Sequence, residues 1–238
     1  IGVSSLEDLF SHIPRALVFQ DEPNLPDELP YMEAAEKLHS IAPKTNLRDS
    51  FIGDLLPVWK THPIVDYVSK LRPLTTSYTP YQPERSQGTL VTHWIFQCAL
   101  SAITGFEAIN TSLYDRSAAI FEAISCAIRT NTRGNKVLLA ESLFSKDLEV
   151  LETLAKETEM ELILVPLATE EGLVDYDALE QMSDEDSEGI AAFVFPQVNK
   201  FGLLENVDRL SDFSHAKGIR SIACIDPMLL ATGGLKPP

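Results

Sequence analysis

The chain has 238 residues, of which 45% are hydrophobic and 23% are charged, so it can bury one large core and does not have the composition of a disordered segment. Its formal net charge of −16 argues against nucleic acid or an anionic membrane surface as a partner, because like charges repel. It contains no apolar run of about 18 residues, the length of a membrane-spanning helix. The first residues show no signal peptide.

The three cysteines, Cys98, Cys126 and Cys224, lie in apolar stretches without CxxC spacing, and the five histidines are scattered along the chain. This spacing argues against a disulfide framework and against a metal site. We therefore expect three buried thiols, no metal and a reducing, cytoplasmic location. The chain starts without a methionine and ends in Pro-Pro, so we also expect further residues at both ends.

Residues 1–80 are predicted to form an irregular N-terminal arm with short helices. The spacing Ser4-x-x-Glu7 matches a capping box and predicts a short helix that ends near Phe10. Frequent prolines predict extended chain after it. The other predicted segments of the arm and its border are helices over residues 31–42 and 63–71 and a proline-stiffened loop over 75–87.

Residues 81–238 are predicted to form one α/β domain, and two long helices open it. Apolar residues recur at helical spacing from Val91 to Ala102 and from Ser117 to Ile128. Short apolar runs then alternate with helical segments, which predicts a mostly parallel sheet with right-handed crossovers. The predicted strands are 136–140, 161–166, 190–195 and 219–225, and the predicted helices between them are 146–158, 175–182 (with Asp175 as its N-cap) and 206–217.

Ligands of such sheets bind at the carboxyl ends of the strands and at helix N-termini. This rule selects Asp226, which follows the last predicted strand, and the turn 196–199 after the third. The sequence has no Walker A loop, GxGxxG, HExxH or GxSxG motif. The topology alone therefore predicts where a site lies but not which reaction it serves.

Residues 77–90, which read SYTPYQPERSQGTL, resemble the Y-T-P-Y-Q-P-E-x-S-Q-G loop of glycine decarboxylases, the P-proteins of the glycine cleavage system. The remaining family-like segments are residues 1–10, 103–105, 110–115, 198–202, 225–227 and 235–238. The resemblance thus covers essentially the whole chain. The chain resembles the N-terminal half of these proteins, which some lineages carry as a separate subunit 1.

The resemblance implies the fold of the fold-type-I pyridoxal-phosphate-dependent transferases. It also implies a shared activity, in which the enzyme decarboxylates glycine and passes the aminomethyl group to the lipoyl arm of H-protein. In this family only the second half, or subunit 2, holds the lysine that forms the Schiff base. We therefore expect no catalytic residue in this chain, pyridoxal 5'-phosphate on the partner subunit at a shared interface, and a heterotetramer.

The resemblance also suggests candidate site residues. The loop residues would line the partner's cofactor and substrate pocket or would only pack the interface, and both interpretations stay open; they are Tyr78, Thr79, Tyr81, Gln82 and Glu84.

Two further places match positions of the fold-type-I site. Asp115, Arg116 and Ser117 lie where these proteins bind the cofactor phosphate, but Arg116 and Ala118 depart from the family pattern, and a solvated or interface arginine is the alternative. Asp226 lies where an active subunit holds the pyridine nitrogen, and we expect it to be a structural relic.

Two other functions stay open. The chain could be an autonomous pyridoxal-phosphate aminotransferase or lyase, which requires a Schiff-base lysine of its own. It could also be a non-catalytic interaction subunit, which the departures at Arg116 and Ala118 would suit.

Overall fold

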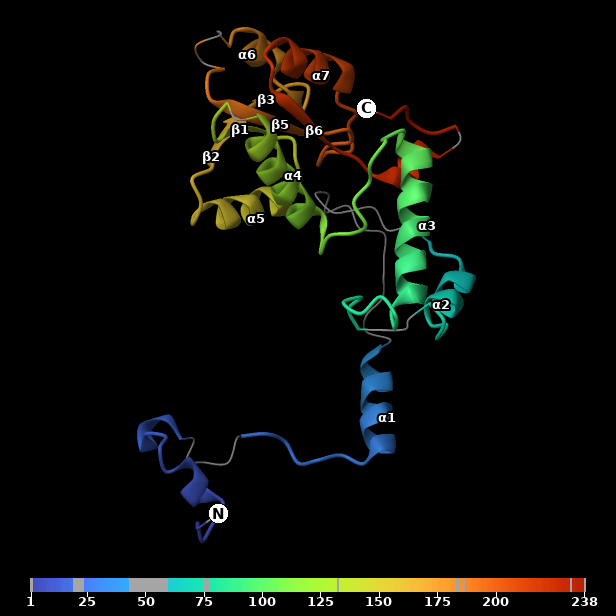
Figure 1. Cartoon of the computed structure of the whole chain (residues 1–238), viewed down its shortest axis with the longest axis vertical. Coiled ribbons are helices and arrows are strands. Elements are labelled where there is room, and N and C mark those ends of the chain that lie inside the picture. The colour runs from blue at the N-terminus through green and yellow to red at the C-terminus, as the bar shows by residue number, and fades with distance from the viewer. Residues whose placement is uncertain are drawn as a thin grey trace. The chain divides into compact units, whose positions relative to one another are not determined.

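A computed structural model of the chain describes residues 2–18, 24–42, 60–74, 78–131, 133–182, 185, 187–231 and 233–237 (Figure 1). Its contacts divide the chain into two units, residues 1–50 and 51–238. The expected border between arm and domain, at residues 80 and 81, falls inside the second unit and stays a prediction.

The first unit consists of short helices, and none of its described residues is buried. They are η1 (Glu7–Phe10), η2 (Arg15–Leu17) and α1 (Tyr31–Ile41). The predicted capping box is wrong by one residue. The carboxylate of Asp8 accepts hydrogen bonds from the backbone N–H groups of Ser4 and Ser5, at 3.0 Å each, and the Ser5 hydroxyl accepts one from the Asp8 N–H. The side chain of Asp8 is one methylene shorter than that of Glu7, but it starts one position further along the chain, and its carboxylate reaches both N–H groups.

The second unit is built on a four-stranded parallel sheet with the order β2-β1-β5-β6. The strands are β1 (Lys136–Ala140), β2 (Glu161–Val165), β5 (Ile190–Pro196) and β6 (Arg220–Cys224). All four predicted strands are confirmed. Every residue of β5 is buried, as expected for a central parallel strand that is covered on both faces.

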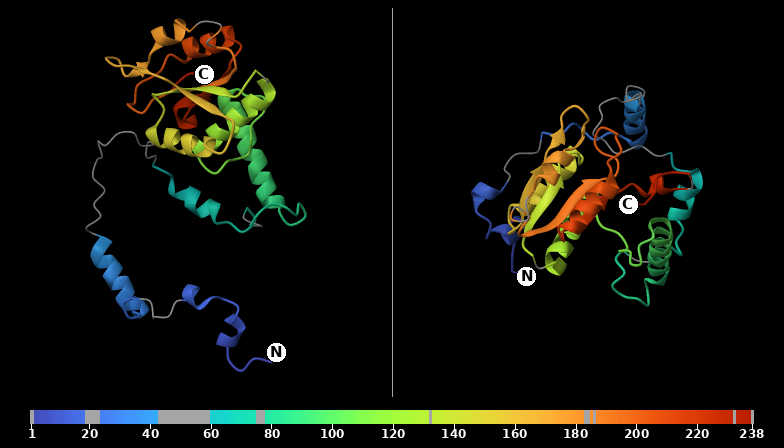
Figure 2. Two further views of the ribbon diagram at one scale, coloured as in Figure 1. Left: turned by 90° about the vertical axis from the view of Figure 1, so that its left-hand side faces the viewer. Right: turned by 90° about the horizontal axis from the view of Figure 1, so that it is seen from above.

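Helices cover both faces of this sheet (Figure 1), and the left view of Figure 2 shows the same layers. The helices α4 and α5 lie on one face, and α6 and α7 lie on the other. Their bounds are α4 (Arg116–Asn131), α5 (Ser145–Ala155), α6 (Tyr176–Glu180) and α7 (Val207–Ala216). The predicted cap of α6 is confirmed, since Asp175 Oδ1 accepts a hydrogen bond from the Ala178 N–H at 3.0 Å.

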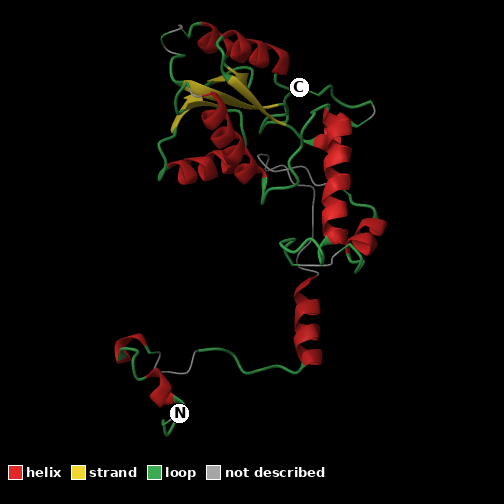
Figure 3. Ribbon diagram, viewed as in Figure 1, coloured by secondary structure: helices red, strands yellow, loops and turns green. Residues whose placement is uncertain are grey.

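Four short elements were not predicted: η2, which lies where extended chain was expected, β3 (Leu167–Ala168), β4 (Leu173–Val174) and η4 (Pro227–Leu230). Figure 3 shows the sheet in yellow between its red helices. β3 and β4 form a small antiparallel hairpin. Two-residue strands are too short to leave a period in the sequence.

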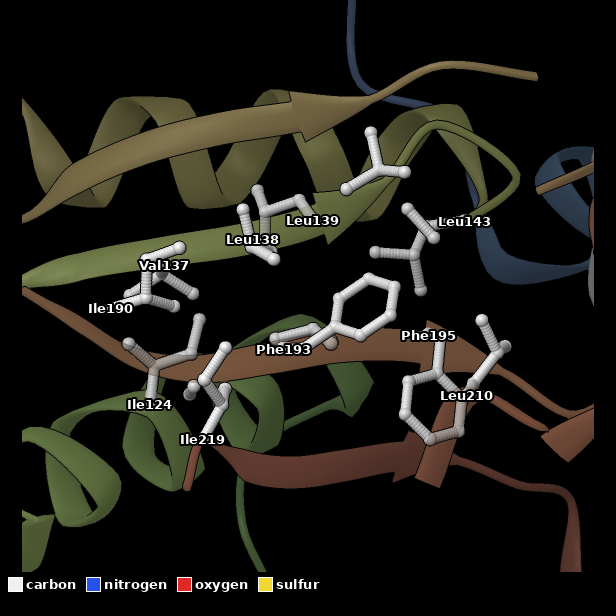
Figure 4. Close-up of a cluster of buried hydrophobic side chains, with 14 of the residues drawn as sticks. Ile124, Val137, Leu138, Leu139, Leu143, Ile190, Phe193, Phe195, Leu210 and Ile219 are labelled. Atoms are coloured by element: carbon white, nitrogen blue, oxygen red, sulfur yellow. The ribbon is translucent and has the colours of Figure 1, made fainter. Parts of the chain in front are cut away.

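The core lies between the sheet and its helices (Figure 4). Phe193 of β5 is fully buried at its centre. Its ring centroid lies 5.2 Å from that of Phe195 and 6.2 Å from that of Phe213, in tilted and edge-on arrangements. This packing fixes the carboxyl ends of the central strands.

The second unit also contains α2 (Pro63–Ser69) and α3 (Gln87–Thr104). The predicted end of α3 is confirmed, because Gly105 adopts φ 79°, the left-handed conformation of a helix C-cap. None of the eighteen residues that the structure describes in α3 is buried. No described helix is both long and apolar enough to cross a membrane.

The expectation of three buried thiols is wrong for two of them. Cys98 on α3 and Cys126 on α4 are exposed, and Cys224 is half-buried. Cys126 lies on the outer face of its helix, and Cys98 lies on a helix that has several exposed large apolar side chains. Apolar neighbours in the sequence therefore did not determine burial.

Candidate functional site

The loop before α3 presents its side chains to solvent. Tyr78 is fully exposed and Tyr81 is 86% exposed, while Thr79 is half-exposed and Gln82 and Glu84 are exposed. The first three residues of the predicted loop, 75–77, lie outside the described residues.

Local hydrogen bonds hold this loop in a defined shape. The Tyr81 N–H donates to the Thr79 carbonyl at 2.9 Å, and the Arg85 N–H donates to the Gln82 carbonyl at 3.1 Å. Ser86, at the start of α3, is fully buried and anchors the end of the loop. Two aromatic side chains with polar tips are thus carried outward on a turn-stabilised segment.

The helix that follows the loop is apolar and exposed. Its large exposed apolar side chains are Leu90, Val91, Trp94, Ile95, Phe96 and Ile103. A helix that is apolar on most sides is normally buried in a larger structure, and exposed apolar surface of this kind marks an interaction site. The loop and the helix therefore form a candidate interface.

A second candidate site lies at the carboxyl ends of β5 and β6. A cavity of about 260 Å³ is lined there by Arg116, Phe144, Pro196, Val198, Cys224, Ile225, Asp226, Pro227 and Leu229. The structure thus brings Arg116 and Asp226 to one cavity, as the position of the strand ends predicts. None of the described residues that line it comes from the tyrosine-containing loop.

The start of α4 binds a carboxylate of the chain itself. Nε and Nη2 of Arg116 both lie 2.6 Å from Oδ2 of Asp147, and the Ser117 hydroxyl donates to Oδ1 of Asp147 at 2.6 Å. Asp147 is only 3% exposed. Asp115 caps the same helix, since its Oδ1 accepts a hydrogen bond from the Ala118 N–H at 2.7 Å. Arg116 is therefore paired within the chain and is not a solvated arginine, while its interface alternative stays a prediction.

Two other residues that line the cavity, Asp226 and Cys224, interact with neighbouring groups of the chain. Oδ1 of Asp226 accepts a hydrogen bond from the Met228 N–H at 3.0 Å and so caps η4. Burial, together with the smaller effect of the charge of Asp147, raises the pKa of the Cys224 thiol to about 12, although Arg116 acts to lower it. Cys224 therefore stays a neutral thiol at physiological pH and is not a nucleophile.

These residues do not fit a cofactor phosphate at the start of α4. The Arg116 and Ser117 donors that would hold it already hold the carboxylate of Asp147. No lysine occurs among the described residues that line the cavity. Nor does any group of three or more His, Cys, Asp or Glu side chains in the described ranges lie where it could bind a metal.

The sequence prediction missed a buried polar network in the turn after β5. Asn199 donates from Nδ2 to Oε1 of Glu205 at 3.0 Å, and Oε2 of Glu205 accepts from the Val174 N–H at 3.2 Å and from the Tyr176 hydroxyl at 3.3 Å. Desolvation by burial, with Glu205 nearby, raises the pKa of Tyr176. The network ties the turn to the β3-β4 hairpin and so shapes the strand ends. Glu205 lies about thirty residues from Val174 and Tyr176 in the sequence, so no local sequence pattern predicts these contacts.

Comparison with known proteins gives the family. The family model of the glycine cleavage system P-protein matches residues 1–238. The chain is 35% identical over 240 residues to a probable glycine dehydrogenase (decarboxylating) subunit 1 of Legionella pneumophila (strain Lens), covering 100% of this chain and 52% of that protein. A protein of the same name from Nitrosomonas europaea is 32% identical, again over 100% of this chain and 51% of that protein.

Solved structures agree with this match. A crystal structure of an inhibitor-bound glycine decarboxylase (P-protein) of the glycine cleavage system aligns with a TM-score of 0.79 at 30% identity, over 100% of this chain and 52% of that one. Tryptophan decarboxylase of Catharanthus roseus aligns with a TM-score of 0.57 at 13% identity, over 88% of this chain and 49% of that one, and shares the fold. The predicted fold-type-I architecture is thereby confirmed.

The chain spans about half the length of the relatives that it matches. The match nevertheless runs through all of its residues, from the N-terminal unit to the last strand and the segment after it. The chain therefore belongs to the glycine cleavage system P-protein family.

Proposed function

We propose that this chain acts as the non-lysine subunit of glycine decarboxylase. Together with a lysine-bearing subunit 2 it would decarboxylate glycine and transfer the aminomethyl group to the lipoyl arm of H-protein, in a cytoplasmic heterotetramer. The names of the relatives, glycine dehydrogenase (decarboxylating) subunit 1, support this assignment. So does the misfit of the start of α4 to a cofactor phosphate, because it leaves the cofactor to the partner.

Pyridoxal 5'-phosphate on the partner supplies an electron sink for the decarboxylation. The contribution of this chain is to position and shield the reacting groups. In the proposal, Tyr78, Thr79, Tyr81 and Gln82 reach into the partner's pocket, while Glu84 lies at its rim. The hydroxyl groups donate hydrogen bonds to the glycine carboxylate or to the cofactor, and the rings exclude water.

The observation that carries this proposal is the exposure of the proline-containing segment 78–86, which its own turn hydrogen bonds hold in shape. Tyr78 and Tyr81 project from it with almost no contact to their own chain. A loop that is fixed by its own turns loses little conformational entropy when it inserts into a neighbouring pocket. Tyrosine is well suited to such contacts, since it combines a large apolar area with a polar tip and few rotatable bonds.

The apolar surface of α3, which directly follows the loop in the sequence, also supports assembly with a partner. Burial of apolar area contributes about 25 cal/mol per Å², and aromatic side chains such as Trp94 dominate the energy of many interfaces. Trp94 is 67% exposed in this chain. A partner that covers α3 would hold the adjoining loop in its pocket.

Replacement of Tyr78 or Tyr81 by Phe in the complex reconstituted with subunit 2 tests the pocket role. Loss of a hydrogen bond to a charged group should lower the rate of glycine decarboxylation roughly 10- to 100-fold. Tyr114→Phe is the matched control, because Tyr114 is 96% exposed but lies outside the loop. Association of the subunits should be measured separately by sedimentation. Full decarboxylation by both loop variants in an intact complex would rule the role out.

A further inference from the structure

We propose that the carboxylate of Asp147 takes the place of a ligand phosphate at the start of α4, so that the cavity of this subunit stays closed to phosphate-bearing cofactors. The two Arg116 contacts and the Ser117 contact, each at 2.6 Å, converge on that one carboxylate. The inference concerns a cavity made by this chain alone. Its consequence for the partner subunit rests on the proposed function.

The position is one where anions bind in proteins of this architecture. α4 begins beside the carboxyl ends of the parallel strands, and the N-terminus of a helix carries a partial positive charge. Arg116 adds a full positive charge, and its guanidinium group also stacks on the ring of Phe144 at 4.2 Å from the centroid. An arginine, a hydroxyl group and a helix start together form a site for an oxyanion.

The carboxylate of Asp147 of the same chain already occupies that site. Asp147 lies in the first turn of α5, and its backbone N–H donates to the Phe144 carbonyl at 2.9 Å. The fold thus holds the carboxylate in place from the opposite side of the site. Because Asp147 is almost fully buried, solvent screens its charge weakly.

Most of the side-chain donors that face this helix start are directed to Asp147 or to a cap. The Ser117 hydroxyl has one proton, which Asp147 receives. Nε and Nη2 of Arg116 also point to Asp147, and the Ala118 N–H is capped by Asp115. A phosphate would have to displace a buried carboxylate or lie beside it, and the second arrangement is opposed by repulsion between the two anions.

The consequence concerns where the cofactor goes. Asp226 also lines this cavity, but the donors of Arg116 and Ser117 at the start of α4 already hold Asp147. Cofactor is thereby directed to the partner subunit, and each pair of subunits binds one molecule instead of two. The same feature argues against the autonomous pyridoxal-phosphate enzyme that the sequence left open.

The test uses the intact subunit in its complex with subunit 2, already loaded with pyridoxal 5'-phosphate, and inorganic phosphate as the probe. Equilibrium dialysis should show no second anion site in the parent complex. Asp147→Asn keeps the size of the side chain and removes its charge, so this variant should bind one phosphate per subunit at least about tenfold more tightly than the parent. The double variant Asp147→Asn, Arg116→Gln should lose that binding again.

Asp175→Asn is the matched control, because Asp175 also caps a helix through a side-chain oxygen but lies away from the cavity. It should leave phosphate binding unchanged. A folded Asp147→Asn complex without new phosphate binding would overturn the proposal.

A second measurement needs no change at position 147 and decides the matter if that variant fails to fold. The number of pyridoxal 5'-phosphate molecules per pair of subunits should be one in the parent complex and one after Arg116→Gln. Two in the parent and one in the variant would show that Arg116 holds a cofactor, and the proposal would then be wrong. Neither readout depends on glycine decarboxylation, so failure of the proposed function would be seen separately.

Discussion

The strand β5 and the helix α3 are both strongly apolar, yet their surroundings in this chain are opposite. Every residue of β5 is buried, because β1 and β6 pair with it and helices cover both faces of the sheet. α3 has no buried residue in its described range and presents Trp94, Ile95 and Phe96 to solvent. The first segment completes its packing within the chain, and the second does not.

This difference teaches that apolar residues serve two separate purposes here. In β5 they stabilise the fold that positions the strand ends. In α3 they add nothing comparable to the stability of the chain, since burial is the source of hydrophobic stabilisation. They are explained if another subunit covers them, as the proposed function requires. Mutations in β5 should therefore lower the free energy of unfolding, whereas mutations in α3 should weaken binding to subunit 2.

The largest effect is expected from Phe193→Ala. It removes a fully buried ring from the centre of β5 and should lower the free energy of unfolding by about 3–5 kcal/mol. Phe106→Ala is the control, because Phe106 follows α3 and is 60% exposed, and it should change that free energy by no more than about 0.5 kcal/mol. Urea unfolding of the isolated subunit measures both. Equal losses would show that the exposed ring beside α3 stabilises the fold as much as the buried ring of β5 does.

The next effect concerns association and not folding. Trp94→Ser should weaken binding to subunit 2 by about 2 kcal/mol, roughly thirtyfold in Kd, as expected for an aromatic residue at an interface centre. The unfolding free energy of the isolated subunit should not fall, since Trp94 is already exposed there. Val150→Ser, at an exposed apolar position on α5, serves as the control. Calorimetric titration with subunit 2 would contradict the interface role if Trp94→Ser bound as tightly as the parent.

Local sequence patterns predicted the α/β unit well. The short apolar run of β5 and the helical spacing from Val91 to Ala102 each fix one element, and Asp175 marks a helix start by its own side chain. Such signals work because they depend on neighbours within a few residues. The N-terminal capping box failed by one position for the same reason, since two serines and two acidic residues there offer nearly equal local solutions.

Long-range partners could not be predicted in this way. Asp147 binds Arg116 across 31 residues, and Glu205 binds Tyr176 across 29 residues. Local sequence therefore predicts Arg116 as a weak phosphate ligand or as a solvated or interface residue, although the structure pairs it with Asp147. Burial of Cys98 was predicted from its apolar neighbours in the sequence, but the residues that the structure describes leave Cys98 exposed.

The smallest expected effect is a change in thiol reactivity, which compares exposed and buried cysteines directly. With maleimide at pH 8, Cys98 and Cys126 of the isolated subunit should both react, because both are exposed. Cys224 should not react, since burial raises the pKa of its thiol to about 12 and leaves it protonated. In the complex with subunit 2, Cys98 on α3 should become protected, while Cys126 on the outer face of α4 should keep its rate.

The pH dependence of this experiment has a definite sign. Because the folded-state pKa of Cys224 lies above the ordinary value of about 9 for a thiol, the unfolded chain loses its proton first as the pH rises. The folded state is therefore progressively destabilised between about pH 9 and pH 12, and labelling of Cys224 should appear there together with unfolding. Single-cysteine variants assign each rate by mass spectrometry. Labelling of Cys98 at the same rate in the isolated subunit and in the complex would mean that subunit 2 leaves that face of α3 uncovered, and the contrast between β5 and α3 would then need another explanation.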